Sequence, residues 1–587
     1  MEKIYVADFE TRAGEQAIKD GETWVWAWAI CLLDNIEIVA TGSTIEEFME
    51  YVYKLGDCKI YFHNLKFDGN FVLSKLIKDG YKITTEKELK TKEYSCLISD
   101  MGTFYQIKFK MGRGHEVTIW NSLNKIQSSV AKIGKDFKTK YQKLDIDYVE
   151  DRPYGYVMTD EEREYVKNDV RVVAEALKFL YEKGMDRMTA SSDAFHYFLD
   201  MSGGKKSFRN VFPVLEYDIH MFCKNAYRGG FCYCMRPGYY KGVCGNTYDV
   251  NSLYPSMMHS SSLNIYPYGE PRYFKGKYKE DEYYPLYICR IKADFELKEG
   301  FIPSIQIKGN RFKDNEYIIK SDGVVEMTLT SVDLKLFMDH YDIYVLEFID
   351  GWKFKARLGM FDEFIDHLYE IKKTSKGALR QWAKIMLNSF YGRFGLSVIQ
   401  TRKAPEMIEG AVKYKKTDED EIIDPIYMPV ACFVTAYARN FTIRAAQKNY
   451  DGFIYADTDS LHMIGEAVGI EIHESNMSCW DHESEWDEAV FIRQKTYMEK
   501  IGGEWVIKAA GMNEATKEYF KDSIAEGVVT AQDFKLGLKI DGFKLMPKAV
   551  KGGVLLVPSK FEIKETGKSS KKEEYVKIDS HISIMKI

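Results

Sequence analysis

The chain has 587 residues, far more than one hydrophobic core supports, so several domains are expected. Hydrophobic residues make up 45% of it and charged residues 29%, a composition that excludes a disordered chain. The formal net charge of −6 excludes a protein that is basic all over, so a nucleic acid would have to meet local basic strips, such as the one between Lys372 and Arg393.

The chain carries no signal of secretion or of a membrane segment. It opens Met-Glu-Lys-Ile-Tyr, without the apolar core of a signal peptide, and its longest apolar run, from Trp24 to Leu33, has about half the length of a membrane span. Its cysteines lack the spacing of a disulfide framework, which favours a reducing compartment. One cysteine cluster exists, and its spacing is not that of a common zinc site: Cys223, Cys232, Cys234 and Cys244.

The first part of the chain predicts an α/β domain. The runs IYVADFET, WVWAWAICLL and IEIVATG have strand character and are separated by turn residues, and YFHNLKFDGNFVLSKLIKDG predicts a strand that leads into a helix. Another helix is predicted to begin near Thr159, because Thr-Asp-Glu-Glu-Arg offers an N-cap and an acidic first turn. We expect this domain to end near residue 190.

This part of the chain contains four acidic residues and a tyrosine in a suggestive order. Asp8 and Glu10 lie two apart in the first strand, so their carboxylates leave the same face of the sheet. A D-x-E pair alone is more often a surface pair, but Asp68 near a helix start and Asp169 on the later helix complete a set. A two-metal phosphodiesterase needs four carboxylates and a hydroxyl that orients the attacking water, and Tyr165 shares a helical face with Asp169.

The second half predicts a strand over 246–250, a long helix over 372–394 and a hairpin over 453–464. Asp249 ends the strand, before a turn that exposes backbone near Val250, and Asp457 and Asp459 lie in the hairpin turn. A D-T-D turn alone is more often an Asx-type loop. With Asp249, however, it fits a nucleotidyl-transfer site, where two ions bridge carboxylates, primer hydroxyl and incoming triphosphate.

The predicted long helix carries polar residues on one face. Lys384, Asn388, Tyr391 and Gly395 recur at helical spacing, whereas a buried stripe would rarely carry Lys and Asn. A lysine there can neutralise triphosphate charge, and a tyrosine can pack against the nascent base pair. Tyr254 can lie beneath the incoming sugar and exclude a 2′-hydroxyl, which favours deoxyribonucleotides.

These motifs resemble those of family B DNA polymerases that carry a DEDDy proofreading exonuclease, since DVNSLYP, KIMLNSFYG and YADTDS match their motifs A, B and C. The resemblance implies an α/β and α+β multidomain fold, with an RNase H-like exonuclease domain and a right-hand polymerase domain of palm, fingers and thumb. It implies two Mg²⁺ ions per active site, with Mn²⁺ as the second candidate. The implied metal ligands are Asp8, Glu10, Asp68 and Asp169 at the exonuclease site, where Tyr165 positions the water, and Asp249, Val250, Asp457 and Asp459 at the polymerase site.

The resemblance also implies binding residues. RQKTY matches the family's K-x-Y motif, YRGG the segment that links the two activities and guides template, and TAYAR a segment near template or primer. The implied nucleotide-binding residues are Tyr254, Lys372, Arg380, Lys384, Asn388, Tyr391 and Lys495. The implied DNA-binding residues are His63, Asn64, Phe67, Ser122, Leu123, Tyr227, Arg228, Gly229, Gly230, Arg439 and Tyr497.

The spacing of the motifs points to one branch of the family. The stretches between motifs A and B and between motifs B and C are longer than a palm needs, and the chain is compact, as in the protein-primed replicases of small Bacillus phages. This resemblance implies an exonuclease domain at 1–190, palm at 191–261 and 429–530, fingers at 360–395 and thumb at 531–587. It further implies an insertion at 262–359 that contacts a terminal protein and an insertion at 396–428 that confers strand displacement and processivity.

The predicted function is DNA-dependent DNA synthesis from a terminal-protein primer, with 3′–5′ proofreading. The expected partners are primer-template DNA, dNTPs and the terminal protein, with the chain as a monomer or a heterodimer with that protein, in the cytoplasm of a host cell and away from membranes. Two alternatives remain open at this point. One is a polymerase of the same family that starts from a nucleic-acid primer, and the other is an inactive DNA-binding replication scaffold.

Overall fold

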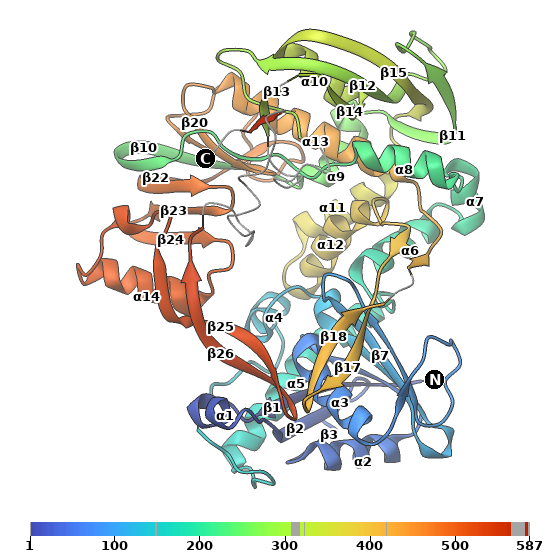
Figure 1. The fold of residues 1–587 in the computed structure, drawn as a ribbon, viewed down its shortest axis with the longest axis vertical. Coiled ribbons are helices and arrows are strands. Elements are labelled where there is room, and N and C mark those ends of the chain that lie inside the picture. The colour runs from blue at the N-terminus through green and yellow to red at the C-terminus, as the bar shows by residue number, and fades with distance from the viewer. Residues whose placement is uncertain are drawn as a thin grey trace.

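The structure is a computed structural model that describes residues 2–146, 150–306, 317–321, 323–417, 420–564 and 582–584. Within these residues the chain forms three large sheets of eight, seven and six strands. The sheets follow one another along the longest axis, with the first sheet at the lower end of Figure 1 and the third at the upper end. None of the described helices is both long and apolar enough to cross a membrane.

The first sheet has the order β3-β2-β1-β4-β8-β7-β6-β5, with β4 parallel to its neighbours β1 and β8. Alternate residues of β1 and β2 enter two cores: Val6 and Ala29 pack with helix α5, and Ala7 and Ile30 pack with α2 and α3. This burial on both faces explains the nearly continuous apolar run of β2. The strands are β1 Lys3–Thr11, β2 Val25–Leu32, β3 Val39–Gly42, β4 Cys58–Phe62, β5 Lys82–Ile83, β6 Glu93–Ile98, β7 Phe104–Lys110 and β8 Glu116–Asn121.

The helices around this sheet are α1 Gly14–Asp20, α2 Ile45–Leu55, α3 Leu65–Lys78, α4 Val130–Phe137 and α5 Asp160–Glu182. The predicted start of α5 is confirmed, because Thr159 and Glu162 form a reciprocal capping box. The predicted strands β1 and β2 and the strand-to-helix transition from β4 to α3 are also confirmed. The third predicted strand, IEIVATG, is confirmed only from Val39, because Ile36 and Glu37 form a turn.

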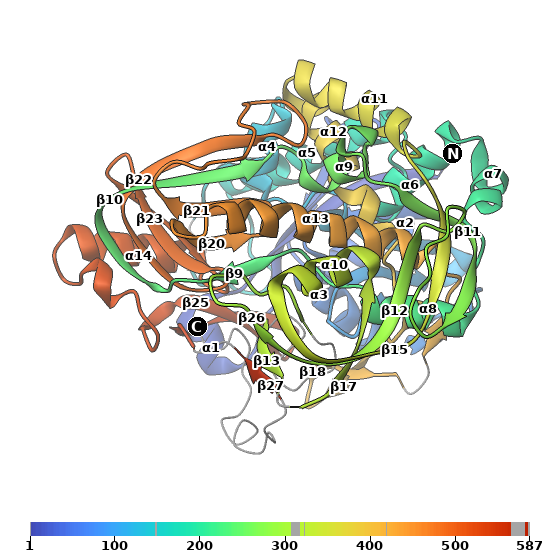
Figure 2. The same ribbon diagram turned by 90° about the horizontal axis from the view of Figure 1, so that it is seen from above.

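The second sheet is antiparallel, with the order β24-β23-β22-β10-β21-β20-β9. Helix α13 lies between this sheet and the third-sheet region and contacts both (Figure 2). The predicted hairpin is confirmed as β20 and β21, while the predicted strand over 246–250 is the end of the longer β10. The elements are β9 Cys232–Cys234, β10 Gly238–Val250, β20 Phe453–Asp457, β21 Ser460–Ile464, β22 Trp480–Arg493, β23 Thr496–Ile501, β24 Glu504–Ala509, α9 Leu253–Met258 and α13 Met428–Lys448.

The third sheet is built from residues between β10 and the helices over 362–390, with one further strand from near the end of the chain. Its long central strands β12 and β15 bury Ile291 and Phe295 against helix α10. The elements are β11 Tyr266–Lys275, β12 Leu286–Leu297, β13 Ile318–Ser321, β14 Val325–Thr330, β15 Tyr341–Arg357, β27 Ile582–Ile584 and α10 Ser331–His340.

The predicted long helix over 372–394 is wrong as a single element. It is divided between α11 Asp362–Thr374 and α12 Gly377–Phe390, followed by the 3₁₀ turn η4 Tyr391–Arg393. The break has a local cause: Ser375 and Lys376 are extended and Gly377 has a φ of 59°, a left-handed conformation that glycine adopts without strain. The two helices pack on each other and lie between the first sheet and the upper sheets (Figure 1).

Aromatic packing holds this helix pair to the helices that follow the first domain. Phe198 of α6 contacts Phe364 of α11 and Phe390 of α12, with ring centroids 5.8 and 4.8 Å apart. The remaining helices and 3₁₀ turns are α6 Ala190–Met201, α7 Gly204–Val211, α8 Tyr217–Ala226, α14 Glu514–Ala525, η1 Gly112–Gly114, η2 Ser122–Asn124, η3 Ser260–Ser262 and η5 Ala531–Asp533.

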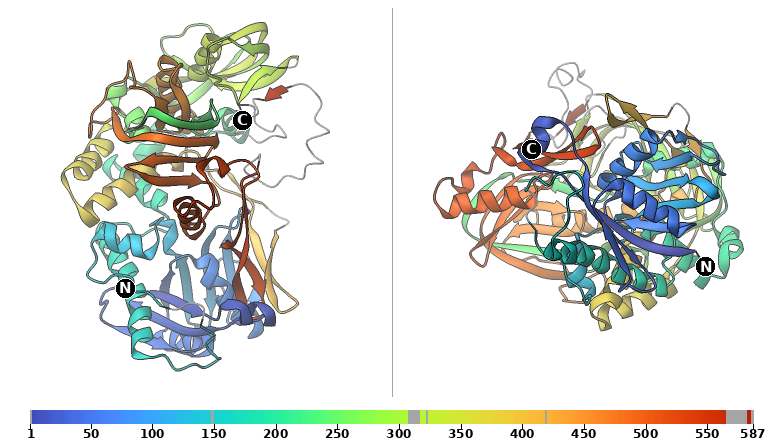
Figure 3. Two further views of the ribbon diagram at one scale, coloured as in Figure 1. Left: turned by 90° about the vertical axis from the view of Figure 1, so that its left-hand side faces the viewer. Right: turned by 90° about the horizontal axis from the view of Figure 1, so that it is seen from below.

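Two long hairpins run side by side from the upper part of the molecule to the first sheet (Figures 1 and 3). The β17–β18 hairpin docks there through Tyr414, which donates a hydrogen bond of 2.7 Å to Asn70. The tip of the β25–β26 hairpin docks through backbone, since the Thr23 N–H donates to the Lys551 carbonyl at 3.0 Å. The strands are β16 Ile399–Gln400, β17 Lys403–Ile408, β18 Ala411–Lys416, β19 Glu421–Ile422, β25 Lys539–Val550 and β26 Gly553–Glu562.

Candidate active sites

The first candidate site lies where β1, α3 and α5 meet. Asp8 and Glu10 leave one face of β1, and α5, which packs on that strand, brings Asp169 to them. Carboxylate oxygens of these three residues lie within 4.8 Å of one another. Asp68 of α3 is buried beside them and raises the pKa of Asp8. The four predicted carboxylates therefore do come together.

The electrostatics of the first site favour the binding of a cation. Burial raises the pKa of Asp8 well above its usual range, and the charges of Asp68, Glu10 and Asp169 add to the effect. Burial and then the charge of Asp169 raise the pKa of Glu10 to about 7. Burial also raises the pKa of Asp68 and Asp169. Carboxylates that resist ionisation because they crowd each other are stabilised in their charged form by a cation between them.

Two buried oxygen atoms without hydrogen bonds in the described part of the chain also make the first site suitable for a metal ion. Asp68 Oδ1 and Asp169 Oδ1 are buried and accept no hydrogen bond within the described residues. Buried carboxylate oxygens are normally paired or bound to metal, and oxygen ligands of this kind suit Mg²⁺ and Mn²⁺.

Sequence reasoning missed one member of this site. Lys143 donates a 2.5 Å hydrogen bond to Asp169 and a 3.0 Å hydrogen bond to the Tyr165 hydroxyl. It thereby joins the predicted water-positioning tyrosine to a predicted metal ligand. Lys143 lies in an irregular segment after α4, where neither spacing nor periodicity marks it, so the sequence offered no signal for it.

The residues that are predicted to contact a DNA 3′ end near this site differ in how exposed they are. His63 lies between the Ser122 hydroxyl, 2.9 Å away, and the Ser128 carbonyl, 2.7 Å away. Ser122 is fully buried, so its observed role is to hold His63 in place. Asn64 is exposed with a φ of 70° at the start of α3, while Phe67 and Leu123 are partly exposed. Asn64, Phe67 and Leu123 are thus accessible to a strand end.

The second candidate site lies at the edge where β10 ends and β20 turns into β21. Asp249 pairs in register with Ser460, and the Val250 N–H donates to the Asp459 carbonyl at 2.8 Å. Burial, followed by the charge of Asp459, raises the pKa of Asp249 to about 8, and burial raises the pKa of Asp459 to about 6. Tertiary structure thus unites carboxylates from two distant segments.

Two acidic residues that the sequence analysis did not select lie near this site. Asp481 pairs with Asp249 across β10 and β22, and it contributes with Glu483 to the raised pKa of Asp249. Like the first site, the second concentrates negative charge where it is partly screened from water. The donor set of carboxylates again suits a divalent metal.

Helix α12 presents a face of exposed basic and polar residues near the second site. Arg380, Lys384 and Asn388 are exposed at successive turns of α12, while Ala383 and Leu387 are buried on its other side. The predicted polar face is confirmed for this helix, but Tyr391 lies in the 3₁₀ turn η4 and Gly395 beyond it, so neither continues the helical face.

Lys372 and the two tyrosines complete the predicted nucleotide contacts. Burial, followed by the charges of Lys384 and Arg380, lowers the pKa of Lys372 to about 8. Its amine donates to the Ser252 hydroxyl at 2.6 Å, just after Asp249 in the chain. Tyr254 and Tyr391 stack with ring centroids 4.1 Å apart.

The K-x-Y segment reaches the same carboxylates from β23. The Lys495 amine contacts Asp457 at 2.6 Å, and the Lys495 N–H donates to the Tyr455 hydroxyl at 2.9 Å. The Tyr497 ring packs against the Tyr455 ring with centroids 5.0 Å apart. The predicted lysine therefore lies at the site, with its charge beside the third carboxylate.

The YRGG segment passes next to the D-T-D turn, but its arginine points inward. A Cβ at Gly230 would lie 2.6 Å from the Thr458 side chain, so this close approach requires glycine. Tyr227 is partly buried and Gly229 exposed, while Arg228 is buried and donates to the carbonyls of Asn225 and Gln306.

Arg439, which the resemblance places near template or primer, is buried in the structure. Its side chain is 1% exposed and forms a bidentate ion pair with Asp333. It also donates to the carbonyls of Arg228 and Gly229 at 2.9 and 2.8 Å. A buried guanidinium needs such partners, and here they fix the backbone of the YRGG segment.

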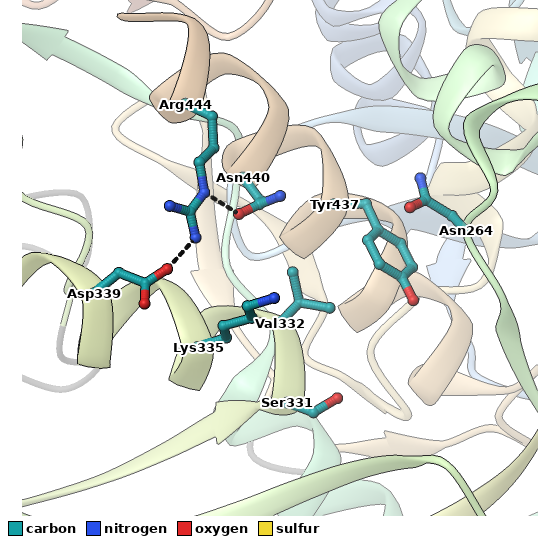
Figure 4. A pocket seen from close by; sticks show the side chains of 8 residues that line it. All are labelled: Asn264, Ser331, Val332, Lys335, Asp339, Tyr437, Asn440 and Arg444. Carbon is teal, nitrogen blue, oxygen red and sulfur yellow. Dashed lines mark hydrogen bonds and ion pairs between the residues drawn. The ribbon is translucent and has the colours of Figure 1, made fainter. Parts of the chain in front are cut away.

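Two cavities lie away from both sites, along the face of α13 opposite the D-T-D turn. Thr442 of α13 donates to the Thr458 carbonyl, whereas Asn440 and Arg444 are roughly 200° from it around the helix and face a cavity of ≈ 510 Å³. Figure 4 shows Arg444 bound to Asp339 and Asn440 there, with Lys335 close by. A neighbouring cavity of ≈ 420 Å³ shares Asn440 and Arg444. No predicted site residue lines either one.

Comparison with known proteins gives concordant matches over nearly the whole chain. The family model described as DNA polymerase type B, organellar and viral, matches residues 50–468. The DNA polymerase of Bacillus phage phi29 is 41% identical over 96% of this chain and 99% of its own length. The corresponding enzymes of Bacillus phage Nf and Streptococcus phage Cp-1 are 42% and 32% identical, each over 96% of this chain and 100% and 99% of their own.

The fold matches as well. The structure of phi29 DNA polymerase complexed with primer-template DNA superposes with a TM-score of 0.88 at 39% identity, covering 96% of this chain and all of that one. The ternary complex of the same enzyme with incoming nucleotide gives 0.87 at 40% identity with the same coverage.

Proposed function

Because the chain belongs to the family of type B DNA polymerases described as organellar and viral, we propose that it replicates phage DNA from a protein primer and uses two separate metal-dependent sites. As in its relatives, its activity is that of a DNA-directed DNA polymerase with a 3′–5′ exonuclease. The observation that carries the proposal is the pair of carboxylate centres. The first joins Asp8 and Glu10 of the first sheet to Asp169 of α5, and the second joins Asp249, Asp457 and Asp459 at one edge of the second sheet.

Synthesis is assigned to the second centre. A divalent metal bound by Asp249, Asp459, Asp457 and the Val250 carbonyl would lower the pKa of the primer hydroxyl and neutralise charge on the triphosphate. The exposed stripe of α12 binds the triphosphate through Arg380 and Lys384. Mg²⁺ is the proposed ion, with Mn²⁺ as a substitute.

The tyrosines and the K-x-Y segment orient the substrates. Tyr254 and Tyr391 stack where the nascent base pair would lie, so the incoming nucleotide must displace one ring from the other. The Tyr254 ring then lies under the sugar and leaves no room for a 2′-hydroxyl. Lys495 and Tyr497 hold the primer terminus beside Asp457.

Proofreading is assigned to the first centre. Asp8, Glu10, Asp68 and Asp169 would hold Mg²⁺, which would lower the pKa of a bound water and so supply a hydroxide nucleophile at neutral pH. The Tyr165 hydroxyl, held by Lys143, positions the attacking water. Asn64, Phe67 and Leu123 receive the frayed 3′ end, and His63 is held by Ser122 to take part.

The partners are proposed from the relatives and from the two insertions. Phi29 DNA polymerase has been seen complexed with primer-template DNA, with incoming nucleotide and with single-stranded DNA, and we assign the same ligand classes to this chain. The insertion at 262–359, which forms most of the third sheet, is proposed to receive the terminal protein, and the β17–β18 hairpin, within 396–428, to separate the downstream strand.

The remaining domain assignments of the sequence analysis stay as proposals with the same bounds. The exonuclease domain is 1–190, the palm 191–261 and 429–530, the fingers 360–395 and the thumb 531–587, of which part lies outside the described residues. The chain acts in the host cytoplasm as a monomer or as a heterodimer with the terminal protein.

A gel assay of two activities tests the assignment of the sites. The purified chain, Asp249→Ala and Asp8→Ala are each given a primed single-stranded circle with dNTPs and Mg²⁺, and separately a single strand without dNTPs. We expect Asp249→Ala to lose synthesis by at least about a thousandfold and to keep 3′ degradation, and Asp8→Ala to do the reverse.

The two-site proposal fails if Asp249→Ala still extends the primer, or if both variants lose both activities while the protein stays folded. Protein priming is tested next, by incubating the chain with a candidate terminal protein and one labelled dNTP. A covalent nucleotide–protein adduct supports it, and extension of nucleic-acid primers alone would return the conventional polymerase as the better reading.

A further inference from the structure

A buried polar network lies directly behind the second site. The His462 Nδ1 atom is 2.7 Å from the Glu499 Oε1 atom, and the Thr247 hydroxyl donates to the same oxygen at 3.1 Å. His462 Nε2 lies 3.2 Å from the Ser460 hydroxyl. All four side chains are at most 8% exposed. An acid, an imidazole and two hydroxyls thus share one enclosed cluster.

Each member belongs to a strand that carries a proposed active residue or begins directly after one. Thr247 precedes Asp249 by two residues on β10, and Ser460 and His462 follow Asp459 on β21. Glu499 follows Tyr497 by two residues on β23. Since residues two apart in a strand share a face, the network lies on the same face as Asp249.

The pairing of the strands places the cluster beside Asp249. Ser460 is paired with Asp249 itself, and Thr247 is paired with His462. The row of Thr247 and His462 lies about 7 Å along the strands from the row of Asp249, which is one repeat of two residues. The network therefore begins in the row of Asp249 and extends away from the D-T-D turn.

Glu499 and His462 also control the orientation of the K-x-Y segment. The His462 ring packs edge-to-face on Tyr497 with centroids 4.9 Å apart, and Tyr455 packs on both rings. The Tyr455 hydroxyl in turn accepts the N–H of Lys495, whose amine contacts Asp457. One chain of contacts therefore runs from Glu499 to the lysine at the catalytic turn.

Stability alone does not account for a carboxylate at this position. Burial of an ionised group is costly, and a buried polar pair is often no more stabilising than apolar residues of the same volume. A satisfied buried network does, however, fix a single arrangement of the elements that carry it. The best-supported benefit of such a network is that it fixes the register of the strands. Three strands that share one active site require a fixed register.

We propose that Glu499 is a positioning residue for nucleotide addition, which acts through His462 and Thr247 to hold the strands of Asp249, Asp459 and Tyr497 in one register. The inference rests on the proposed polymerisation site and adds to it a residue that touches neither metal nor substrate. Truncating Glu499 leaves the Thr247 hydroxyl and the His462 imidazole without their shared acceptor, and the strands lose their common anchor.

The test compares Glu499→Ala, Glu499→Gln and Glu504→Ala by single-nucleotide addition on primer-template DNA with Mg²⁺, with 3′ degradation of single-stranded DNA as the internal control. We expect Glu499→Ala to lower kcat about tenfold or more, while KM for the nucleotide changes less than threefold because α11 and α12 are untouched. Glu499→Gln keeps an acceptor oxygen, so it should retain at least a third of kcat. Glu504, an exposed glutamate of the adjacent strand β24, should tolerate alanine.

Unchanged kcat in Glu499→Ala would overturn the proposal, and so would an equal loss of synthesis and degradation, which would assign Glu499 to folding. Thr247→Val, which keeps the shape and removes one donor, should give a smaller fall in kcat, and a fully active Thr247→Val would also count against it. Failure of the polymerisation site itself is recognised separately, because Asp249→Ala would then retain synthesis.

Discussion

Glu10 shows how a single side chain can make the stability of the protein depend on both pH and metal. Burial and the neighbouring Asp169 raise its pKa from 4.5 to about 7. Between these values the folded chain holds a proton that the unfolded chain releases, so the free energy of unfolding falls as pH rises from about 4.5 to about 7. A metal ion at the site removes this penalty by compensating the charge.

In EDTA we therefore expect the protein to melt at a higher temperature at pH 5 than at pH 8. Glu10→Gln cannot titrate and should reduce that difference by about 2 °C or more, as measured by differential scanning fluorimetry. Glu15 is exposed, so Glu15→Gln is the matched control and should leave the difference in melting temperature between pH 5 and pH 8 unchanged. Mg²⁺ at pH 8 should stabilise the wild type more than Glu10→Gln. An undiminished pH dependence in Glu10→Gln would show that Glu10 is not the titrating group.

Among the elements, α12 connects local sequence to substrate binding most directly. Its buried side, with Ala383 and Leu387, packs toward the aromatic cluster around Phe390 and fixes the rotation of the helix. The polar side is thereby directed away from that core, with Lys384 near enough to Lys372 to lower the pKa of that amine. Helix amphipathicity thus aims a basic stripe at the place where the triphosphate is proposed to bind.

Lys384→Ala should raise KM for dNTP about tenfold or more, because a charge-assisted hydrogen bond to a phosphate contributes about 1.5–3 kcal/mol. Lys335→Ala is the matched control: this lysine is also exposed on a helix, but it lines the cavity behind α13. Steady-state incorporation of one nucleotide measures both. Equal KM values for Lys384→Ala and the wild type would exclude a triphosphate contact, and a raised KM in Lys335→Ala would assign the effect to general surface charge.

At the scale of the whole molecule, the two long hairpins tie distant parts of the chain to the first sheet. The β17–β18 hairpin contributes Val412 to the core of that domain, and the β25–β26 hairpin contributes Val554. The two hairpins contact each other through β18 and β25. Removing the whole segment 396–428 would also remove Tyr427, which is fully buried. A shorter excision is therefore the better probe.

Replacing residues 401–420 by a short glycine linker should abolish displacement of a downstream strand while sparing gap filling. The ends can be joined because Gln400 and Glu421 are paired across β16 and β19. Extension on a gapped circle measures both activities, and degradation of single-stranded DNA checks that the first domain stays folded. Undiminished strand displacement would remove this role from the hairpin.

Local sequence determined much of the fold near the proposed sites. The alternating and continuous apolar runs predicted β1, β2 and β4, Thr159 and Glu162 predicted the start of α5, and the D-T-D turn predicted the β20–β21 hairpin. These features depend on contacts within a few residues, so the local sequence is enough to predict them. The break before α12 was missed because a single glycine inside a helical pattern is an ambiguous signal.

The sequence by itself predicted the carboxylates of the two proposed sites that lie in recognisable motifs, because acid spacing and motif resemblance are properties of short segments. Tertiary structure alone decided the rest: Lys143 at the first site, Asp481 and Glu483 at the second, the inward orientation of Arg439 and the network behind Asp249. Each depends on residues far apart in the chain that strand register or helix packing brings together. No local sequence pattern predicts these contacts, because the free energy that stabilises them comes from the burial and pairing of groups that only the folded chain places side by side.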